Sequence, residues 1–334
     1  MKKVAIHTLG CKLNFAESST IGRQFLQNGF EVSSSDEQAD IHIVNTCSVS
    51  HRADRECRQL IRHIHRNSPG AYIIVVGCYT QLQPEEVASI EGVDLVLGTN
   101  EKFKIFEFAN HFQKNNYPKI FVSEIKKSDD FGIAYSGDAD GRTRAFLKVQ
   151  DGCDFKCTYC TIRITRGDFE QYHASKLEEE FLAFDDILLV ADSPTVEQIK
   201  DWYKLAKKHN KGFSIRNVEP SVTVRCKDEL IDLAESGLLK VYHSPIQSDN
   251  PAVLRDMHRS INDAIETMEI SRILKQNGVY IATNIIIDYK DFNQDFSKIY
   301  GLYDYVSWNP LWDNVWDIKK AEERFEKYLG SGAE

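Results

Sequence analysis

The sequence has 334 residues, of which 42% are hydrophobic and 27% are charged, and its formal net charge is −9. This length exceeds that of a typical single core, so we expect two domains, and no apolar run reaches the roughly 20 residues that a membrane-spanning helix needs. The acidic balance argues against a protein that binds nucleic acid over its whole surface, although a local basic face can still meet a polyanion.

Strand and helix patterns alternate through the first hundred residues. Apolar, strand-like runs occur at four places, 3–10, 40–46, 71–77 and 93–100. Helical segments separate these runs, and alternation of this kind predicts a parallel sheet covered by helices. We expect this amino-terminal domain to span 1–113 and to end with a helix over 102–113. A polar, glycine-containing linker over 114–140 is expected to follow.

The second half repeats the alternation of strands and helices. Six strand candidates occur there, at 145–150, 185–192, 212–220, 240–247, 280–288 and 303–310. Six strands that alternate with helices are typical of a partial barrel. We therefore predict an α/β fold, with an open parallel sheet followed by a partial (β/α)6 barrel over 141–334.

The eight cysteines point to metal or redox chemistry. The first residues lack a long apolar segment and a small-residue cleavage site, so we expect a cytoplasmic protein. Thiols stay reduced in the cytoplasm, which makes disulfides poor candidates there. The placement of the cysteines then indicates which chemistry they serve.

Cys153, Cys157 and Cys160 form a C-x3-C-x2-C motif directly after the strand candidate 145–150. Three thiolates in one loop can hold three irons of a four-iron cluster and leave the fourth iron open to a substrate atom. The alternative is a zinc site. Zinc prefers four ligands, so that site would need a distant partner such as His173 or Cys226.

Cys11, Cys47 and Cys78 each follow one of the first three strand candidates, at intervals of 36 and 31 residues. The carboxyl ends of neighbouring parallel strands converge on one crevice, so the three thiols are expected to meet and to form a second site with an open iron. The alternative is that they are buried as small hydrophobic side chains. We assign Cys57 and Cys226, which lie in helix-like sequence, to packing.

The motif over 153–160, with an aromatic Tyr159 before its last cysteine, resembles that of the radical S-adenosylmethionine (SAM) superfamily. Together with the stretches TLGCKLNFAES, NTCSVSHRADRECRQLIR, VVGCYTQ and RAFLKVQDGCDFKCTYCTI, and with Arg166 and Gly167 downstream, the chain resembles the methylthiotransferases. It is most similar to the members that act on threonylcarbamoyladenosine in tRNA. The resemblance implies a radical SAM barrel, two 4Fe-4S clusters, S-adenosylmethionine, and an electron donor such as flavodoxin or ferredoxin.

After residue 170 the resemblance rests on fewer positions. The segments SIRNVEPS and HSPIQSDNPAVLRDMHR match the family at Glu219, Gln247, Ser248, Met257 and Arg259. The family's glycine-rich turn after the second barrel strand is replaced here by ADSPT. We therefore expect either that Ala191 and Asp192 build a different rim or that Asp192 serves as a polar cofactor contact. The resemblance implies that Tyr159, Glu219, Gln247 and Arg259 contact the cofactor, and Asp192 is the fifth candidate contact.

The expected partner is tRNA, bound through a basic helical face. Arginines recur every three or four residues between Arg52 and Arg66 and would form one stripe able to meet phosphates, although a solvated helix face is the plain alternative. No basic RNA-gripping tail of the TRAM kind is expected within these 334 residues. Two further alternatives are a radical SAM enzyme that inserts sulfur into, or methylates, a peptide or small substrate, and a non-catalytic iron-sulfur binding protein.

Overall fold

The computed structural model describes residues 1–33, 38–48, 51–109, 111–114, 116–125, 134–136, 144–168, 170–171, 174–290, 292 and 294–310. These residues form two compact units. The amino-terminal unit contains the described residues of 1–154 and 161–172, and the carboxyl-terminal unit contains those of 155–160 and those after 173. Much of the predicted linker over 114–140 lies outside the described residues, as do His173 and the chain after 310.

The amino-terminal unit is built from alternating strands and helices. Its elements are β1 Lys3–Thr8, α1 Lys12–Gln27, β2 Glu31–Ser33, β3 Ile41–Thr46, α2 His51–Asn67, β4 Tyr72–Gly77, α3 Cys78–Leu82, α4 Pro84–Ala88, β5 Val93–Leu97, α5 Ile105–Phe108, β6 Lys119–Phe121, β7 Ala134–Ser136, β8 Ala145–Lys148, β9 Gln150–Asp151, α6 Ile162–Arg166 and β10 Glu170–Gln171.

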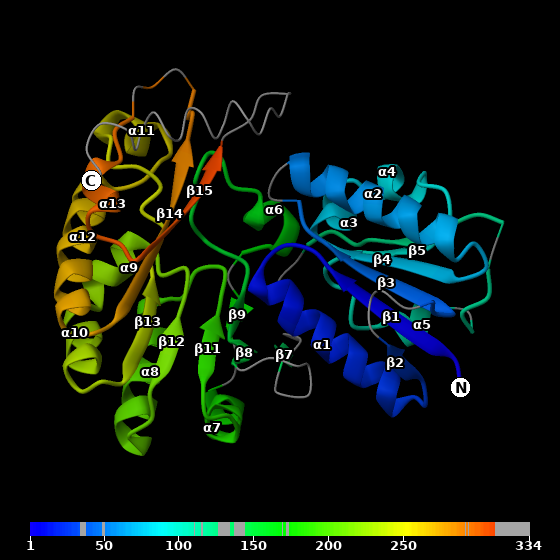
Figure 1. Ribbon diagram of the computed structural model, residues 1–334, viewed down its shortest axis with the longest axis horizontal. Helices are drawn as coiled ribbons and strands as arrows, with labels where there is room; N and C mark the ends of the chain where they lie inside the picture. Colours follow the sequence, from blue (N-terminus) through cyan, green and yellow to red (C-terminus); the bar gives the residue numbers. More distant parts are fainter. Residues whose placement is uncertain are drawn as a thin grey trace. The chain divides into compact units, whose positions relative to one another are not determined.

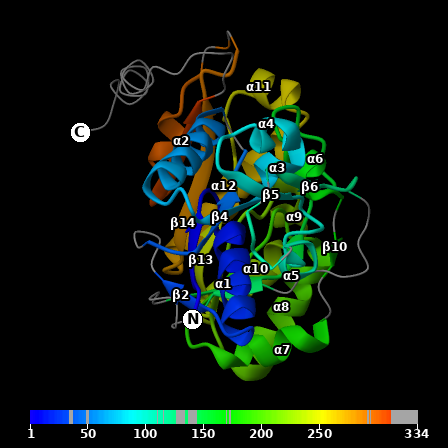
Figure 2. The ribbon, with the colours of Figure 1, turned by 90° about the vertical axis from the view of Figure 1, so that its right-hand side faces the viewer.

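Six of these strands form one parallel sheet in the order β2-β1-β3-β4-β5-β6. Helix α1 lies on one face of this sheet and α2 on the other, with β4 between them (Figures 1 and 2). The four predicted strands of this domain are therefore confirmed. The short strands β2 and β6 were not predicted, and β6 pairs with β5 from within the range expected to be a linker.

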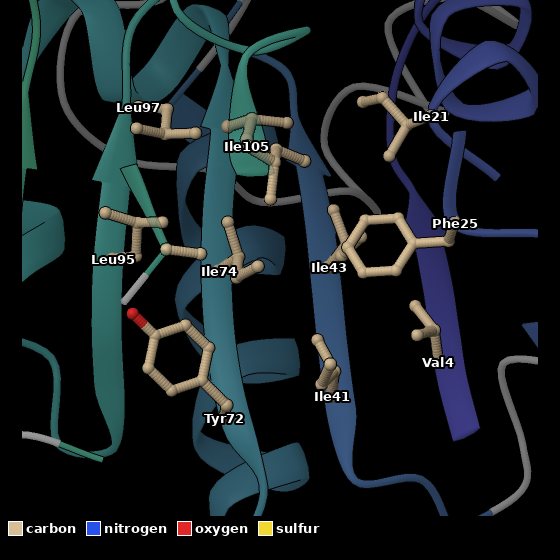
Figure 3. Packing of buried hydrophobic residues seen from close by; sticks show 12 residues of the cluster. Val4, Ile21, Phe25, Ile41, Ile43, Tyr72, Ile74, Leu95, Leu97 and Ile105 are labelled. Carbon is tan, nitrogen blue, oxygen red and sulfur yellow. The ribbon is translucent and has the colours of Figure 1, made fainter. Parts of the chain in front are cut away.

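Two apolar layers hold the sheet, because consecutive strand residues point to opposite faces. Ile74 of β4 packs with Phe25 of α1 in one layer (Figure 3), whereas Val75 packs with Ile61 of α2 in the other. All six residues of β4 are buried, as expected for a central parallel strand. The predicted helix over 102–113 is only the four-residue α5 in the structure.

Phenylalanines explain why that helix is short. Phe103, Phe106, Phe108 and Phe112 all pack against the α1 layer of the core. Phe106 and Phe108, two residues apart, would point to opposite sides of a helix, so the four rings cannot share one helical stripe. The chain turns through positive φ at Phe112 instead of continuing as a helix.

The carboxyl-terminal unit repeats strand and helix along the chain. Its elements are α7 Ala174–Ala183, β11 Ile187–Val190, α8 Val196–His209, β12 Phe213–Ile215, α9 Pro220–Arg225, α10 Lys227–Glu235, β13 Leu239–His243, α11 Pro251–Asp256, α12 Ile261–Gln276, β14 Tyr280–Ile287, α13 Ser297–Tyr300 and β15 Tyr305–Pro310.

The strands β11 to β15 of this unit are parallel and lie in chain order. Helices α10 and α12 lie on the same side of β13 and β14 (Figure 1). Local signals fix the helix ends: Thr195 and Gln198 form a capping box at the start of α8, and Asn210 adopts a left-handed conformation at its end. The six strands predicted for the second half are confirmed. Among the described residues, no helix is both long and apolar enough to cross a bilayer.

Candidate metal and cofactor sites

Cys11, Cys47 and Cys78 follow β1, β3 and β4, which are adjacent in the amino-terminal sheet. The strand register pairs Thr8 with Asn45 and Thr46 with Gly77, so the three cysteines follow the sheet at the carboxyl ends of its strands. The three cysteines therefore follow adjacent strands of one sheet, and that their thiols meet stays a prediction.

Two glycines allow the backbone to approach closely at these strand ends. A Cβ atom added to Gly10, which has φ +94°, would lie 2.4 Å from Cys47 Cβ. One added to Gly77, which has φ +108°, would lie 2.5 Å from the carbonyl oxygen of Thr46. Each glycine precedes a cysteine of the set, and a larger residue there would push the strand ends apart.

Asn14 ties the Cys11 turn to the end of β3. Its amide nitrogen donates hydrogen bonds to the carbonyl oxygens of Leu9 at 2.8 Å and Thr46 at 2.9 Å, while Cys11 Sγ lies 3.7 Å from its Oδ1. Cys11 is also the N-cap residue of the 16-residue helix α1. The partial positive charge of a helix N-terminus favours a thiolate or another anion at this position.

The three thiolate donors, and the close approach of the backbone that Gly10 and Gly77 allow, fit an iron-sulfur cluster. As placed, however, no three His, Cys, Asp or Glu side chains in the described part of the chain stand so that they could hold a metal ion. Cys57, by contrast, lies in the core of α2, and burial raises the pKa of its thiol to about 12, while Cys226 is buried with its pKa raised to about 11. Such protonated thiols suit packing.

Five buried charged groups meet beneath the α1 N-terminus. Glu17 of α1 lies 2.7 Å from Lys102 Nζ, 2.8 Å from Lys148 Nζ and 2.8 Å from Arg166 Nη1. Asp151 accepts from Lys148 at 2.5 Å and from Arg166 at 2.7 Å. With three cations and two carboxylates, the cluster carries one excess positive charge. We call these five residues the charge cluster.

Opposing effects set the pKa values inside the charge cluster. Burial alone would raise the pKa of Glu17, but the charges of Arg166, Lys102 and Lys148 outweigh it and hold that pKa well below its usual value. Burial also acts to raise the pKa of Asp151, but the charges of Lys148 and Arg166 outweigh it and lower this pKa. At Lys102 burial is the larger effect and lowers the pKa. At Lys148 the charges of Asp151 and Glu17 outweigh burial and raise the pKa.

The loop that carries Cys153, Cys157 and Cys160 begins in the amino-terminal unit. Cys153 follows β9, and its backbone N–H donates to the carbonyl oxygen of Gly167 at 3.2 Å. The preceding Gly152 has φ +74°, and a Cβ there would lie 2.2 Å from the carbonyl oxygen of Asp168. The residue after α6 therefore fixes the backbone of Cys153, and Arg166 at the end of α6 belongs to the charge cluster.

Cys157 and Cys160 lie in the carboxyl-terminal unit, where Arg259 is the central side chain. Arg259 lies 3.6 Å from Cys157 Sγ, 3.3 Å from the Tyr159 hydroxyl and 3.2 Å from Glu219 Oε1. Burial raises the pKa of Tyr159, so its hydroxyl stays protonated. Cys160, for its part, donates its backbone N–H to the carbonyl oxygen of Cys157 at 3.2 Å. A buried cation thus stands beside a thiol of the motif.

The remaining predicted contacts are Asp192 and Gln247. Asp192 follows β11 by two residues and is half-buried, and Gln247 is buried at φ +69°. The backbone of Gln247 donates to Asn284 and accepts from Ile286, each at 2.8 Å, and so extends the edge of β14. No described hydrogen bond or ion pair joins Asp192 or Gln247 to the Arg259 group. Of the segment residues, Ser248 accepts from Gln294 at 3.3 Å, and Met257 packs with Tyr289.

Asn14, Glu17, Lys102 and Asp151 were not predicted as site residues. Arg166 was noted as part of a motif. Glu17 and Lys102 lie in helix-like and turn-like sequence, where charged residues are usually exposed. Their role becomes visible only in the folded chain, where Glu17 contacts Lys102, 85 residues away, and Lys148, 131 residues away.

The basic face of α2 is partly paired. Arg52 contacts Glu56 at 2.7 Å, and Arg58 contacts Glu86 at 3.0 Å. The other three arginines, Arg55, Arg62 and Arg66, are exposed and have no ion pair with a described residue. Spacings of seven and four place these three on one side of the helix. We call them the arginine stripe.

Comparison with family models divides the chain in two. The model of the uncharacterized protein family UPF0004 matches residues 3–98, and that of the radical SAM superfamily matches residues 147–302. The chain also matches the solved structure of the radical S-adenosylmethionine methyltransferase TsrM from Kitasatospora setae. The TM-score is 0.57 at 11% identity, over 90% of this chain and 70% of that one, a likeness of fold.

Curated relatives match along most of the chain. The threonylcarbamoyladenosine tRNA methylthiotransferase MtaB of Bacillus subtilis is 30% identical over 321 residues, which cover 90% of this chain and 70% of the relative. The ribosomal protein uS12 methylthiotransferase RimO of Caldicellulosiruptor saccharolyticus is 26% identical over 92% of this chain and 74% of the relative. The tRNA-2-methylthio-N(6)-dimethylallyladenosine synthase of Methylacidiphilum infernorum is 24% identical over 92% of this chain and 71% of the relative.

Proposed function

The chain belongs to the radical SAM methylthiotransferase family, and we propose that it inserts a methylthio group at an unactivated carbon-hydrogen bond of a tRNA adenosine derivative. As a member of that family it is a transferase that uses S-adenosylmethionine and two 4Fe-4S clusters. The observation that carries the proposal is the occurrence of two separate sets of three cysteines, each set at the carboxyl ends of strands. The substrate and the ligand residues are the proposed parts.

Cys153, Cys157 and Cys160 are the proposed ligands of the cluster that works with S-adenosylmethionine. When bound there, the cluster and its cofactor supply the one-electron chemistry that removes a hydrogen atom from the substrate. Arg259 contributes a buried positive charge beside Cys157, and Glu219 holds that charge in place at 3.2 Å. A cation beside a thiolate stabilises the anionic form of the ligand.

Cys11, Cys47 and Cys78 are the proposed ligands of the second cluster. The N-terminus of α1 at Cys11 favours negative charge there, and Asn14 fixes the turn that carries Cys11. Insertion of sulfur requires the sulfur donor and the substrate radical to be held together, which favours rigid supports over mobile loops. Strand ends joined by close-packed glycines are such supports.

The arginine stripe on α2 supports tRNA as the substrate. Three exposed, unpaired cations on one helix face suit the regular negative charges of a nucleic acid backbone, and the acidic remainder of the chain limits other contacts. Several relatives act on tRNA, as their names state. We further propose a cytoplasmic location, where tRNA is found and thiols stay reduced, and an electron donor such as flavodoxin or ferredoxin.

Anaerobic reconstitution tests the cofactor part of the proposal. The wild-type chain should bind about eight irons, as expected for two four-iron clusters, and should form 5′-deoxyadenosine from S-adenosylmethionine with a reductant. A Cys157→Ala variant should lose about half of the iron and all 5′-deoxyadenosine formation. A Cys47→Ala variant should lose about half of the iron, keep 5′-deoxyadenosine formation and yield no methylthio product. Zinc at stoichiometry, or intact iron content in both variants, contradicts the assignment.

Mass spectrometry tests the substrate part. Nucleosides from tRNA of a deletion strain should lack one methylthioadenosine derivative, which should return with the wild-type gene but not with the Cys47→Ala gene. If all methylthioadenosines are unchanged and ribosomal protein uS12 loses a methylthio group instead, the substrate is a protein. The reaction class would then stand, but the tRNA proposal would be wrong.

A further inference from the structure

One face of the sheet in the carboxyl-terminal unit is covered by helices. Phe213 of β12 contacts Phe181 of α7 with ring centroids 6.2 Å apart, and the Tyr242 hydroxyl of β13 lies 2.5 Å from Thr223 Oγ1 of α9. Side chains alternate along a strand, so the residues next to Phe213 and Tyr242 point to the opposite face. We call this opposite face the inner face.

The strand register places four residues in one row across the inner face. The pairing of β12 with β13 brings Arg216, which directly follows β12, level with His243. His243 pairs with Ala282 of β14, and Ala282 pairs with Tyr305 of β15. Ala282 puts a small side chain between His243 and Tyr305, and Arg216 and Tyr305, at the two ends of the row, interact electrostatically.

Arg216 is a cation that has no anionic partner among the described residues. It is half-buried, and no described residue forms an ion pair or hydrogen bond with its guanidinium. The buried arginines Arg166 and Arg259, by contrast, both contact carboxylates, those of Glu17 and Glu219. An arginine stays charged in a protein, and holding such a charge away from water is costly unless an anion accompanies it.

The imidazole beside Arg216 does not add a second positive charge. His243 Nδ1 accepts the backbone N–H of Asn217 at 3.1 Å, so the proton lies on Nε2, which is 3.1 Å from Asn284 Oδ1. A neutral histidine with both nitrogens engaged leaves Arg216 as the charge that a ligand on this row would meet.

The row lies close in sequence to the Arg259 group. Arg216 stands three residues before Glu219, whose carboxylate binds Arg259, and Arg259 contacts Cys157. The inner face and the proposed radical cluster are thus joined by one short segment of the same unit. A substrate group held by Arg216 would lie on the unit that carries this cluster ligand.

We propose that Arg216 binds a carboxylate of the substrate and thereby selects a threonylcarbamoyl-substituted adenosine over a dimethylallyl-substituted one. The inference rests on the proposed function and names the substrate of the same site. A threonylcarbamoyl group keeps the free carboxylate of threonine, whereas a dimethylallyl group is a neutral hydrocarbon. The planar guanidinium matches a carboxylate with two parallel hydrogen bonds. S-adenosylmethionine is a second source of a carboxylate, and the experiment separates the two.

The experiment compares the reconstituted wild-type enzyme with an Arg216→Gln variant. Two readouts are binding of the nucleoside threonylcarbamoyladenosine and binding of its methyl ester, in which the charge is removed. Wild type should bind the acid about 10- to 100-fold more tightly than the ester, the range expected for a charge-assisted pair. Arg216→Gln should bind both alike, and Arg216→Lys should recover part of the preference. A third readout is 5′-deoxyadenosine formation without substrate, whose dependence on S-adenosylmethionine should be unchanged in Arg216→Gln.

Arg272→Gln is the matched control, because Arg272 is an exposed arginine of α12 in the same unit, paired with Glu269. It should keep the full preference for the acid. A wild-type enzyme that does not distinguish acid from ester, or that binds dimethylallyladenosine as tightly, overturns the inference. So does an Arg216→Gln variant that keeps the preference, or one that needs far more S-adenosylmethionine. If the wild type binds the acid selectively but never methylthiolates it in tRNA, the proposed function fails and the inference stands.

Discussion

The guanidinium of Arg166 donates a hydrogen bond to Asn14 Oδ1 at 2.7 Å, although 152 residues separate the two in sequence. Asn14 lies beside Cys11 Sγ, and Arg166 precedes Gly167, which accepts the backbone N–H of Cys153. One buried hydrogen bond therefore connects the turns that carry a cysteine of each set. The distance between Cys11 and Cys153 depends on this contact and on the charge cluster around it.

A Glu17→Gln substitution should destabilise the protein by about 3–5 kcal/mol. The change leaves three buried cations with the single carboxylate of Asp151, and removing one partner of a buried ion pair typically has this cost. The measurement is the free energy of unfolding in urea. Glu56→Gln, which removes an exposed pair with Arg52, is the control and should cost less than about 1 kcal/mol. Equal effects of the two substitutions would contradict a structural role for the charge cluster.

The charge cluster should also make the free energy of unfolding depend on pH. The pKa values of Glu17 and Asp151 are lower in the folded than in the unfolded chain, so the stability they contribute is present above the unfolded values near pH 4 and is lost as the pH falls below them. Unfolding in urea at a series of pH values from 7 to 3 should show this loss. The decline should be shallower in a Glu17→Gln variant, and a parallel decline in both proteins would disprove the assignment.

A Gly10→Ala substitution should remove the second cluster. The added methyl group would lie 2.4 Å from Cys47 Cβ, so the Cys11 and Cys47 turns must separate. Iron content after reconstitution should fall by about half, while 5′-deoxyadenosine formation continues. Gly29→Ala is the matched control, because Gly29 also has positive φ, +81°, but a Cβ there meets nothing within 4 Å. The control should lose about 1 kcal/mol of stability and no iron. Full iron content in Gly10→Ala would exclude this site.

Replacing the arginine stripe should weaken tRNA binding. A triple change of Arg55, Arg62 and Arg66 to Gln removes three cations, and the slope of log affinity against log salt should become shallower by up to about three. The control is Lys200, Lys204 and Lys207 of α8 changed to Gln. These lysines also lie on one side of a helix, but each is already paired with an acidic residue. A salt dependence that is unchanged in the arginine variant would remove α2 from the interface.

The sequence predicted the strands well because their apolar runs are uninterrupted, as in β4 with six buried residues. It also predicted that Cys11, Cys47 and Cys78 follow neighbouring strands, since each interval is one strand and one helix long. The charge cluster was not predictable. Nothing near Lys102 in sequence signals burial beside Glu17, because the contact is made only after both segments fold. Arg216, which has no anionic partner among the described residues, was not predicted for a similar reason, because a strand-end arginine is usually solvated or paired.

The charge cluster also bears on how such proteins can be cut and recombined. Glu17 lies in the segment that the UPF0004 model matches, whereas Lys148 and Arg166 lie in the segment that the radical SAM model matches. The boundary between the two sequence families is therefore not a boundary of folding. A fragment ending at residue 113 would leave Glu17 and Lys102 without three of their charged partners. A chimera that joins halves of two relatives should fold only if both halves contribute matching members of this cluster.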